Sequence, residues 1–337
     1  MRALERLEQL YAIGGGLGAN RPHGSSAEDE AHELAAGWMR EAGLAVEVDA
    51  HANLLGRSAR SDDVWVGSHL DSVPRGGRYD GALGVVAGIE AVERAGAGSA
   101  VAFRGEEVGC IGSRALCAAG LGLPRAFLEL HVEQGPVLAD AGVPLGVVTS
   151  IVGYARGELV FEGRAGHAGT TPMDARDDAL VSAAERILEI RDAAWEVEGA
   201  VATVGELELE PGASNVIPSR ARISVDVRAP EAGGLARLVA GIGFEPAQFT
   251  QPASMDAGLR DVLRDVIAPR GLPVLDLPSG AGHDAGILAA SGIPSAMLFV
   301  RSLNGGVSHS PDELSSDEDV ALAVEVLTAA LARIAAS

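Results

Sequence analysis

The feature that most constrains the fold of this chain is the alternation of short apolar runs with amphipathic segments in its first half. The ranges 48–57, 64–73, 99–107 and 126–135 have the composition of strands, and 81–96 and 112–120 have that of helices. Strands that alternate with helices are joined by crossover connections, which arrange them in parallel. The pattern therefore predicts an α/β fold with a doubly wound, mostly parallel sheet.

From about residue 153 the pattern changes. A strand, a helix, two strands (201–210 and 220–229), a second helix and a strand near Gln248 follow one another, in the order of a βαββαβ, ferredoxin-like sandwich. After residue 253 the chain returns to the α/β pattern. We therefore expect a discontinuous larger domain, 1–152 and 254–337, with a smaller α+β domain, 153–253, inserted into it.

The charge of the chain excludes several classes of protein. Its formal net charge of −21 repels phosphate backbones and anionic lipids, so we expect neither a nucleic-acid partner nor membrane binding. All 26 basic residues are arginine, which excludes Schiff-base chemistry on lysine. The first ten residues carry charges where a secretion signal is apolar, and a cytoplasmic location is expected. Cys110 and Cys117 fit neither a redox nor a zinc motif, and we expect both to be buried as small apolar residues.

Histidines and carboxylates follow the mainly apolar runs VWVG, VAFRG and AFLEL in three of the predicted strands. In an open α/β sheet the carboxyl ends of the strands border the crevice in which ligands bind, so these side chains are expected at one edge. The candidates, just after these runs or in the loops beyond the strands, are His69, Asp71, Asp80, Glu106, Glu107, His131 and His309.

These residue types predict a metal centre. Imidazole and carboxylate ligands without cysteine suit zinc, manganese, cobalt or nickel. A catalytic ion keeps one position open, so three histidines and two or three carboxylates are too many ligands for one ion. A single histidine at a strand end is more often structural, but here several strands deliver such side chains. Two divalent ions that share a carboxylate are the simplest arrangement.

Several strings, in the same order along the chain, resemble one family. They are GSHLDSVPRGGRYDGALGVVAGIEA, ELHVEQGPVL, GHAGTTPMDARDDAL, SNVIP, SGAGHDA and SHSPDEL. This set resembles the N-carbamoyl-L-amino-acid hydrolase and allantoate amidohydrolase family (hydantoinase/carbamoylase), within the di-metal aminoacylase and carboxypeptidase superfamily. The likeness covers nearly the whole chain. It implies a metal-dependent amidohydrolase that cleaves a ureido or carbamoyl C–N bond in a small carboxylate substrate such as an N-carbamoyl-L-amino acid.

The resemblance also implies roles for individual residues. It gives two ligand sets that share Asp80, namely His69, Asp80 and His131 for one ion and Asp80, Glu107 and His309 for the other. Glu106 is then the general base, which accepts a proton from the attacking water and returns it to the leaving nitrogen. Asp71 matches the carboxylate that orients this part of the site.

Further roles fall in and near the inserted domain. His167 matches the histidine that stabilises the anionic tetrahedral intermediate. In relatives this histidine comes from a partner subunit, which implies a homodimer through an inserted lid and dimerisation domain. Asn215 and Arg228 match the pair that holds the substrate carboxylate. Gln134 and His283 match positions that contact the amide or ureido end.

Two groups of alternatives keep the same machinery. One is an allantoate- or ureidoglycolate-type amidohydrolase, and the other is an aminoacylase or dipeptidase of the same superfamily. HVEQGP disfavours the aminoacylase branch, which usually carries a carboxylate where His131 stands. A non-catalytic binding protein would be expected to lack a ligand or the base, and this sequence retains both. Arg301 stands where many relatives have proline, and it either favours a more acidic substrate or faces solvent.

Overall fold

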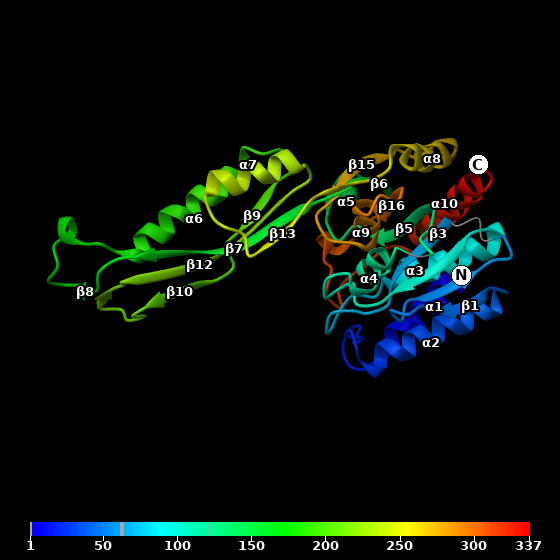
Figure 1. Ribbon diagram of the computed structural model, residues 1–337, viewed down its shortest axis with the longest axis horizontal. Helices are drawn as coiled ribbons and strands as arrows, with labels where there is room; N and C mark the ends of the chain where they lie inside the picture. Colours follow the sequence, from blue (N-terminus) through cyan, green and yellow to red (C-terminus); the bar gives the residue numbers. More distant parts are fainter. Residues whose placement is uncertain (1, 61–63, 121) are drawn as a thin grey trace. The chain divides into compact units, whose positions relative to one another are not determined.

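The chain divides into two compact units. The computed structural model describes residues 2–60, 64–120 and 122–337 (Figure 1). One unit comprises residues 1–151 with 253–337, and the other comprises residues 152–252. The expected boundaries each lie one residue further along the chain. None of the described helices combines the length and apolar character that crossing a membrane requires.

The first unit is built on a mixed sheet. Among the described residues it has nine strands, eight in the order β1-β2-β4-β3-β5-β16-β6-β14, with β15 paired to β6. The strands are β1 (Ala45–Val48), β2 (Leu54–Arg57), β3 (Val64–His69), β4 (Ser99–Phe103), β5 (Ala126–Val132), β6 (Leu145–Ile151), β14 (Ala253–Ser254), β15 (Leu275–Ser279) and β16 (Ser295–Val300). The central strands β4, β3, β5 and β16 are parallel, as the alternation predicts. On one side β2 pairs antiparallel with β4 and with β1, and on the other β6 pairs antiparallel with β16 and with β14.

The range 48–57, predicted as a single strand, includes the turn of a β1–β2 hairpin instead. Asp49 causes the reversal, because its Oδ1 accepts the N–H groups of His51 and Asn53 at 2.8 and 2.9 Å. An aspartate that binds its own backbone two residues further on favours a turn over an extended strand.

Helices cover both faces of this sheet. They are α1 (Arg2–Ala12), α2 (Ser26–Glu41), α3 (Ala82–Ala95), α4 (Ile111–Ala119), α5 (Val137–Asp140), α8 (Ala257–Ile267), α9 (Asp284–Ala290) and α10 (Asp317–Ala335), with short 3₁₀ turns η2 (Ala268–Arg270) and η3 (Asn304–Gly306). Val64 and Val66 point into a core shared with α1, α2, α3, α8 and α10, whereas Trp65 points into a second core with α4 and α9. Gly84 lets α3 lie close to the sheet, since a Cβ there would be 2.5 Å from the Leu130 carbonyl oxygen.

The second unit has its own sheet and core. Its elements are β7 (Gly153–Glu162), β8 (Gly166–His167), η1 (Met173–Ala175), α6 (Ala179–Trp195), β9 (Val201–Thr203), β10 (Leu207–Glu210), β11 (Val216–Ile217), β12 (Arg220–Ala229), α7 (Ala232–Ile242) and β13 (Gln248–Thr250). The sheet order is β10-β12-β7-β13, with β9 also on β12, and β8 pairs with β11. Alternate residues of β12 are buried, and they form the core with α6 and α7.

The range 201–210, predicted as one strand, is interrupted between β9 and β10. The Ser224 hydroxyl accepts the N–H groups of Gly205 and Glu206 at 3.2 and 3.0 Å. These two amides are therefore bound by a side chain at the point where the predicted strand breaks.

Candidate metal centre

Parallel strands bring two of the predicted histidines side by side. In the register of β3 and β5, Val66 lies opposite Leu128, three residues before His69 and His131 respectively. The two imidazole rings stack with their centroids 5.9 Å apart. Asp80 lies just before α3, and the Glu106–Glu107 pair follows β4. The structure thus gathers these side chains at the carboxyl edge of the sheet.

A first group of candidate ligands consists of His69, Asp80 and His131, all buried. Nε2 of His69 lies 3.6 Å from Oδ1 of Asp80, and Nε2 of His131 lies 3.2 Å from the same oxygen. Within the described residues, Nε2 of His69 has no hydrogen-bond partner although it is buried. The donor atoms of all three residues therefore face one point.

A second group consists of Asp80, Glu107 and His309. Nε2 of His309 lies 3.3 Å from Oδ2 of Asp80 and 3.5 Å from Oε2 of Glu107. Asp80 thus presents one carboxylate oxygen to each group. In the part of the chain that the structure describes, these are the two groups with the composition and closeness of a metal site.

The other ring nitrogens of the buried histidines fix their orientation. Nδ1 of His69 lies 3.1 Å from the Asp71 carbonyl oxygen, and Nδ1 of His131 lies 2.9 Å from that of Val132. The Gly81 N–H points at Nε2 of His131 from 3.2 Å. Because a carbonyl only accepts, Nδ1 carries the proton in both rings. Nε2 of each ring is therefore the atom that faces Asp80.

Asp71 joins the end of β3 to the loop after β4. It is completely buried, and its two oxygens accept the N–H groups of Glu106 and Glu107, each at 3.1 Å. Its Oδ1 also lies 3.3 Å from Nδ1 of His69. The carboxylate of Asp71 therefore contacts His69, Glu106 and Glu107. Together with Asp80, His131 and His309, these four residues form what we call the Asp80 cluster.

Burial and neighbouring charges shift the protonation of Glu106. Burial raises the pKa of Glu106 well above its ordinary value, and the carboxylates of Asp284, Glu107 and Asp80 raise it further against the opposing effect of His69. Oε2 of Glu106 lies 3.7 Å from Nε2 of His69. The surroundings of Glu106 thus favour its protonated form, and its carboxyl group lies beside His69 of the first group of candidate ligands.

The shared aspartate has the opposite shift. Burial alone would raise the pKa of Asp80, but hydrogen bonds and charge from His131 and His309 hold it well below its usual range. The bond to Asp80 in turn raises the pKa of His309 to about 9. Asp80 is therefore the anionic centre of the cluster.

Gln134 and His283 lie against the same cluster. Nε2 of Gln134 donates to Oδ2 of Asp80 at 3.0 Å and to the Ser308 hydroxyl at 3.2 Å. The ring of His283 meets that of His131 edge-on, with centroids 4.5 Å apart. Burial lowers the pKa of His283 well below its ordinary value, so this ring is neutral.

In the second unit, His167 and Asn215 come together but Arg228 does not join them. β8 and β11 pair His167 with Val216, and the Ala168 N–H donates to the Asn215 carbonyl oxygen at 3.0 Å. Arg228 lies at the other end of β12 and is paired with Asp226 at 3.2 Å. At about 3.3 Å per residue, the stretch of β12 from Arg220 to Arg228 spans about 26 Å.

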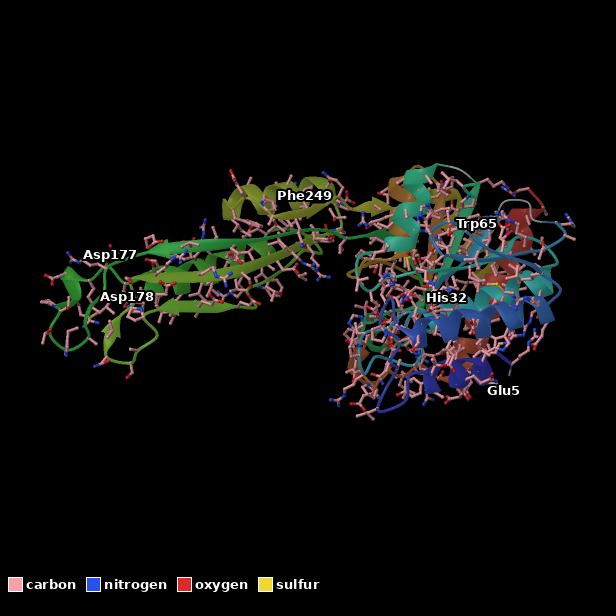
Figure 2. All side chains as sticks on the ribbon, turned by 60° about the horizontal axis from the view of Figure 1, so that its bottom comes forward. Glu5, His32, Trp65, Asp177, Asp178 and Phe249 are labelled. Carbon is pink, nitrogen blue, oxygen red and sulfur yellow. The ribbon has the colours of Figure 1, made fainter. Side chains whose placement is uncertain are left out.

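Asp177 and Phe249, both labelled in Figure 2, mark these two ends of the second unit. Asp177 accepts from the Arg164 N–H near His167, and Phe249 pairs with Ala155 next to the Arg228 end. Asn215 and Arg228, predicted to hold one carboxylate together, therefore lie far apart within a single chain.

The guanidinium of Arg301 is paired within its own chain. Its guanidinium donates twice to Oδ2 of Asp319 in α10, at 2.7 and 2.9 Å, so it is held by the protein itself. Cys110 is buried as expected, but Cys117 is only half-buried, and both are free thiols.

Two buried residues that interact electrostatically or by hydrogen bonds with the candidate ligands were not predicted from the sequence. The buried guanidinium of Arg21 donates to the carbonyl oxygens of Leu70 and Leu10 at 2.7 and 2.9 Å. Burial lowers the pKa of Arg21 to about 10, against the opposing effect of Asp71, Asp80 and Glu107. Nothing in its loop sequence indicates this position. Glu313, by contrast, belongs to the SHSPDEL string, and its spacing from His309 could have drawn attention to it.

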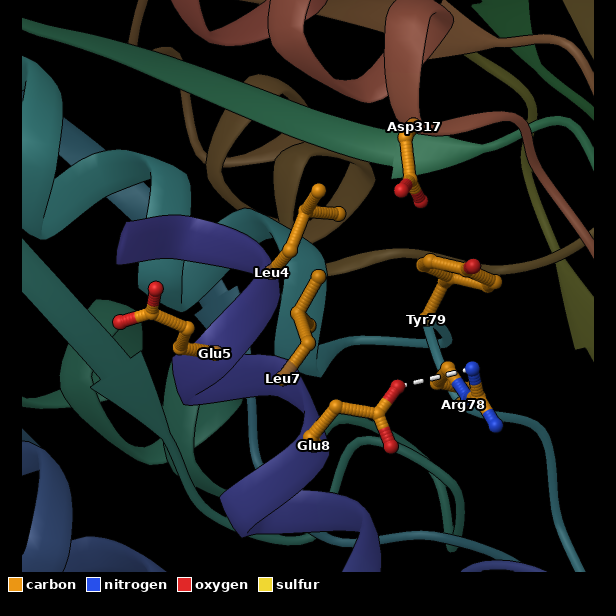
Figure 3. Close-up of a pocket in the computed structure, with 7 residues that line it drawn as sticks. All are labelled: Leu4, Glu5, Leu7, Glu8, Arg78, Tyr79 and Asp317. Atoms are coloured by element: carbon orange, nitrogen blue, oxygen red, sulfur yellow. Dashed lines mark ion pairs between the residues drawn. The ribbon is translucent and has the colours of Figure 1, made fainter. Parts of the chain in front are cut away.

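A separate pocket of about 290 Å³ lies beside α1 (Figure 3). It is lined by Leu4, Glu5, Leu7, Glu8, Arg78, Tyr79 and Asp317, and Arg78 pairs with Glu8 at 2.8 Å. Its lining includes neither of the two candidate ligand groups. This pocket is therefore distinct from the two candidate ligand groups.

The fold and this cluster define a class: an α/β protein with imidazoles and carboxylates gathered for metal binding at the carboxyl edge of its sheet. Residues 65–333 match the model of Peptidase family M20/M25/M40, and the chain belongs to this family. Members of the family generally use two metal ions.

Relatives narrow the class. The N-carbamoyl-L-amino acid amidohydrolase of Geobacillus stearothermophilus is 36% identical over 97% of this chain and 96% of its own. A ureidoglycolate hydrolase of Arabidopsis thaliana is 32% identical over 88% of this chain and 78% of its own. These findings confirm the resemblance to the carbamoylase and allantoate-type branch.

Solved structures agree with this assignment. The crystal structure of an amidase of the hydantoinase/carbamoylase family from Burkholderia phymatum has a TM-score of 0.87 and 30% identity, covering 99% of this chain and 97% of its own. An aminopeptidase PepT from Bacillus cereus, at 18% identity and a TM-score of 0.75, shares the fold alone. The chain is therefore an amidohydrolase of this family, a hydrolase of non-peptide C–N bonds.

Proposed function

We propose that this chain hydrolyses the carbamoyl C–N bond of N-carbamoyl-L-amino acids with the help of two divalent cations. His69, Asp80 and His131 would hold one, and Asp80, Glu107 and His309 the other. The observation that carries the proposal is that the two candidate groups share Asp80, with one carboxylate oxygen directed to each. The carbamoylase relatives support the substrate class.

The spacing of the donor atoms fits cations of this kind. Four ligands at about 2.0–2.2 Å in a tetrahedral site lie about 3.4 Å from one another. The distances from Asp80 to the imidazole nitrogens of His69, His131 and His309 are 3.6, 3.2 and 3.3 Å. Buried Nε2 of His69, which lacks a partner in the described part of the chain, is a donor that a cation would satisfy. Nitrogen and oxygen ligands suit zinc, manganese, cobalt or nickel.

The residues of the cluster then have defined tasks. The bound cations would supply the Lewis acidity that lowers the pKa of water and polarises the substrate carbonyl. Glu106 takes a proton from the water as its oxygen attacks the carbonyl carbon. Glu106 then transfers this proton to the leaving nitrogen as the C–N bond breaks. Asp71 orients His69 during these steps.

Gln134 and His283 are proposed to contact the ureido end of the substrate. Both contact residues of the first candidate group, and His283 is neutral, so it can donate a hydrogen bond without adding charge. Arg301 is not included, because Asp319 already binds its guanidinium.

The inserted unit is proposed to be a ferredoxin-like lid that also forms a homodimer. A small substrate cannot reach both ends of β12, which are about 26 Å apart. We therefore propose that Arg228 and the His167–Asn215 pair of one chain serve different copies of the site in a homodimer. His167 would donate to the anionic oxygen of the tetrahedral intermediate.

An exposed apolar line on α6 supports the dimer. Val181, Leu188 and Trp195 recur at every seventh residue and so share one face of the helix, and Trp195 is 84% exposed. Large apolar side chains that are exposed together on one surface are typical of protein–protein interfaces. With the cytoplasmic location expected from the sequence, the proposal is a soluble homodimeric carbamoylase.

The experiment that tests the function is a substrate panel on chelated protein reloaded with Zn²⁺, Mn²⁺, Co²⁺ or Ni²⁺. Ammonia release from N-carbamoyl-L-amino acids is expected to exceed release from allantoate or ureidoglycolate, and release of amino acids from N-acetyl or dipeptide substrates is expected to be negligible. Glu106→Gln should abolish hydrolysis and retain both ions. Faster turnover of allantoate would show that allantoate, and not an N-carbamoyl-L-amino acid, is the preferred substrate. Full activity of Glu106→Gln would exclude Glu106 as the base.

A further inference from the structure

His309 is the candidate ligand with the least support from regular structure. His69 and His131 lie on strands and are buried, whereas His309 lies in the loop between β16 and α10 with its side chain half exposed. Its backbone has φ of +53°, a conformation that side chains other than glycine rarely adopt. The position of this ring therefore depends on contacts made by the rest of its loop.

The carboxylate of Glu313 makes such a contact. Its Oε2 accepts from the hydroxyl of Ser308, the residue next to His309, at 2.7 Å. Its Oε1 accepts the N–H groups of Tyr79 and Asp80 at 2.7 and 3.1 Å. One side chain thus binds the loop that carries His309 and the loop that carries Asp80, which are more than 200 residues apart in the sequence.

The surroundings of Glu313 fit this bridging position closely. The residue is only 4% exposed, and burial of a carboxylate beside Asp80 is unfavourable unless several donors bind it. Gly77 leaves the necessary room, since a Cβ there would lie 2.2 Å from the Glu313 carboxylate. Gln134 reinforces the bridge, because its amide donates both to Ser308 and to Asp80.

We propose that Glu313 is a positioning residue that sets the distance between Asp80 and His309, and thereby the affinity of the second cation site. This inference rests on the proposed function, because it assumes that Asp80, Glu107 and His309 hold a cation. The carboxylates and backbone carbonyls that orient metal ligands typically contribute 10- to 100-fold in metal affinity.

The effect should be selective for one of the two sites. The imidazoles of His69 and His131 are oriented through Nδ1 by carbonyl oxygens of Asp71 and Val132. Neither contact involves Glu313. Glu313 reaches the His69–Asp80–His131 site only through the backbone N–H of the shared Asp80. Loss of the Glu313 bridge should therefore weaken the site that contains His309 much more than the His69–Asp80–His131 site.

The test is a Zn²⁺ titration of the chelated full-length protein against a chromophoric chelator, with the two dissociation constants fitted separately. Glu313→Ala should weaken the second site by about 10- to 100-fold, with the first within about threefold of wild type. Glu313→Gln should restore most of the affinity, since one amide oxygen can accept both N–H groups and the amide can donate to Ser308. Ser308→Ala removes only the half of the bridge next to His309 and should also weaken the second site alone.

Glu133→Gln is the matched control. Glu133 is another buried glutamate that accepts two backbone N–H groups, those of Val137 and Leu138, at 2.7 and 3.0 Å. This variant should bind both ions as wild type does. Circular dichroism of each metal-free variant checks the fold, and Ser308→Ala, at a partly exposed position, serves if Glu313→Ala does not fold.

Each outcome decides between the proposals. Wild-type affinity at both sites in Glu313→Ala and Ser308→Ala would overturn the role of Glu313, and so would an equal loss at both sites. Failure of the wild-type protein to bind two ions would instead overturn the proposed metal centre.

Discussion

Replacement of Asp71 by asparagine puts an NH₂ group where only acceptors fit. Oδ1 of Asp71 accepts from the Glu106 N–H and lies 3.3 Å from Nδ1 of His69, and Oδ2 accepts from the Glu107 N–H. An asparagine amide keeps one oxygen. If the NH₂ replaces Oδ2, it faces the Glu107 N–H, and if it replaces Oδ1, it faces two donors. At least one buried donor therefore loses its acceptor.

The size of the effect follows from this geometry. A buried donor left without an acceptor costs about 1–3 kcal/mol. In the better orientation one donor is lost, so we expect the free energy of unfolding to fall by about that amount. Because His69 also loses the charge of its neighbour, the affinity of the His69–Asp80–His131 site for Zn²⁺ should fall by about 10- to 100-fold.

The assay is the same chelator competition, combined with denaturant unfolding of the metal-free protein. Asp49→Asn is a suitable control, because Asp49 also accepts two backbone N–H groups but lies in the β1–β2 hairpin. The control should keep wild-type affinity for both ions. Wild-type Zn²⁺ affinity in Asp71→Asn, measured beside wild-type protein that binds two ions, would refute the orienting role of Asp71.

Three further predictions test other parts of the molecule. Burial lowers the pKa of His32 (Figure 2) to about 3, against an unfolded value near 6.5, so the free energy of unfolding should fall by about 2 kcal/mol between pH 7 and pH 5 as the unfolded state takes up the proton. Denaturant unfolding of His32→Leu should lack this part of the loss, and an identical pH dependence would contradict it. His167→Ala should lower kcat for ammonia release about 100-fold or more without loss of bound Zn²⁺, and unchanged turnover would exclude His167. Trp195→Glu should yield monomers in light scattering, and a dimer of wild-type stability would move the interface away from α6.

The candidate cluster could be predicted from the sequence because it depends on periodic features. Apolar strands that alternate with helices become parallel neighbours, and parallel neighbours end at the same edge of a sheet. His69 and His131 lie at or next to the last residue of such a strand, and the register of β3 and β5 brings them level. The mixed edges of the sheet do not disturb this, because the antiparallel strands β2 and β6 lie on either side of its parallel centre.

The features that could not be predicted depend on individual side-chain partners. Asp49 turns a predicted strand into a hairpin, and Ser224 interrupts another, each by accepting two backbone N–H groups. Arg301 is bound by Asp319 in α10, and the apolar or polar pattern around either residue gives no sign of this. The hydropathy of a regular strand or helix repeats at a fixed interval along the sequence, whereas these hydrogen bonds follow no such repeat.

Asn215 and Arg228 show why a linear motif cannot tell whether two residues serve the same site. They are close in sequence, but β12 runs between them, and an extended strand converts each residue into about 3.3 Å of distance. A helix of the same length would cover less than half of that distance, at about 1.5 Å per residue. Because the intervening residues form a strand, one chain presents these two groups at opposite ends of its second unit. If both bind the same small carboxylate, the two groups must come from different chains, so the dimer would be a requirement of the proposed chemistry.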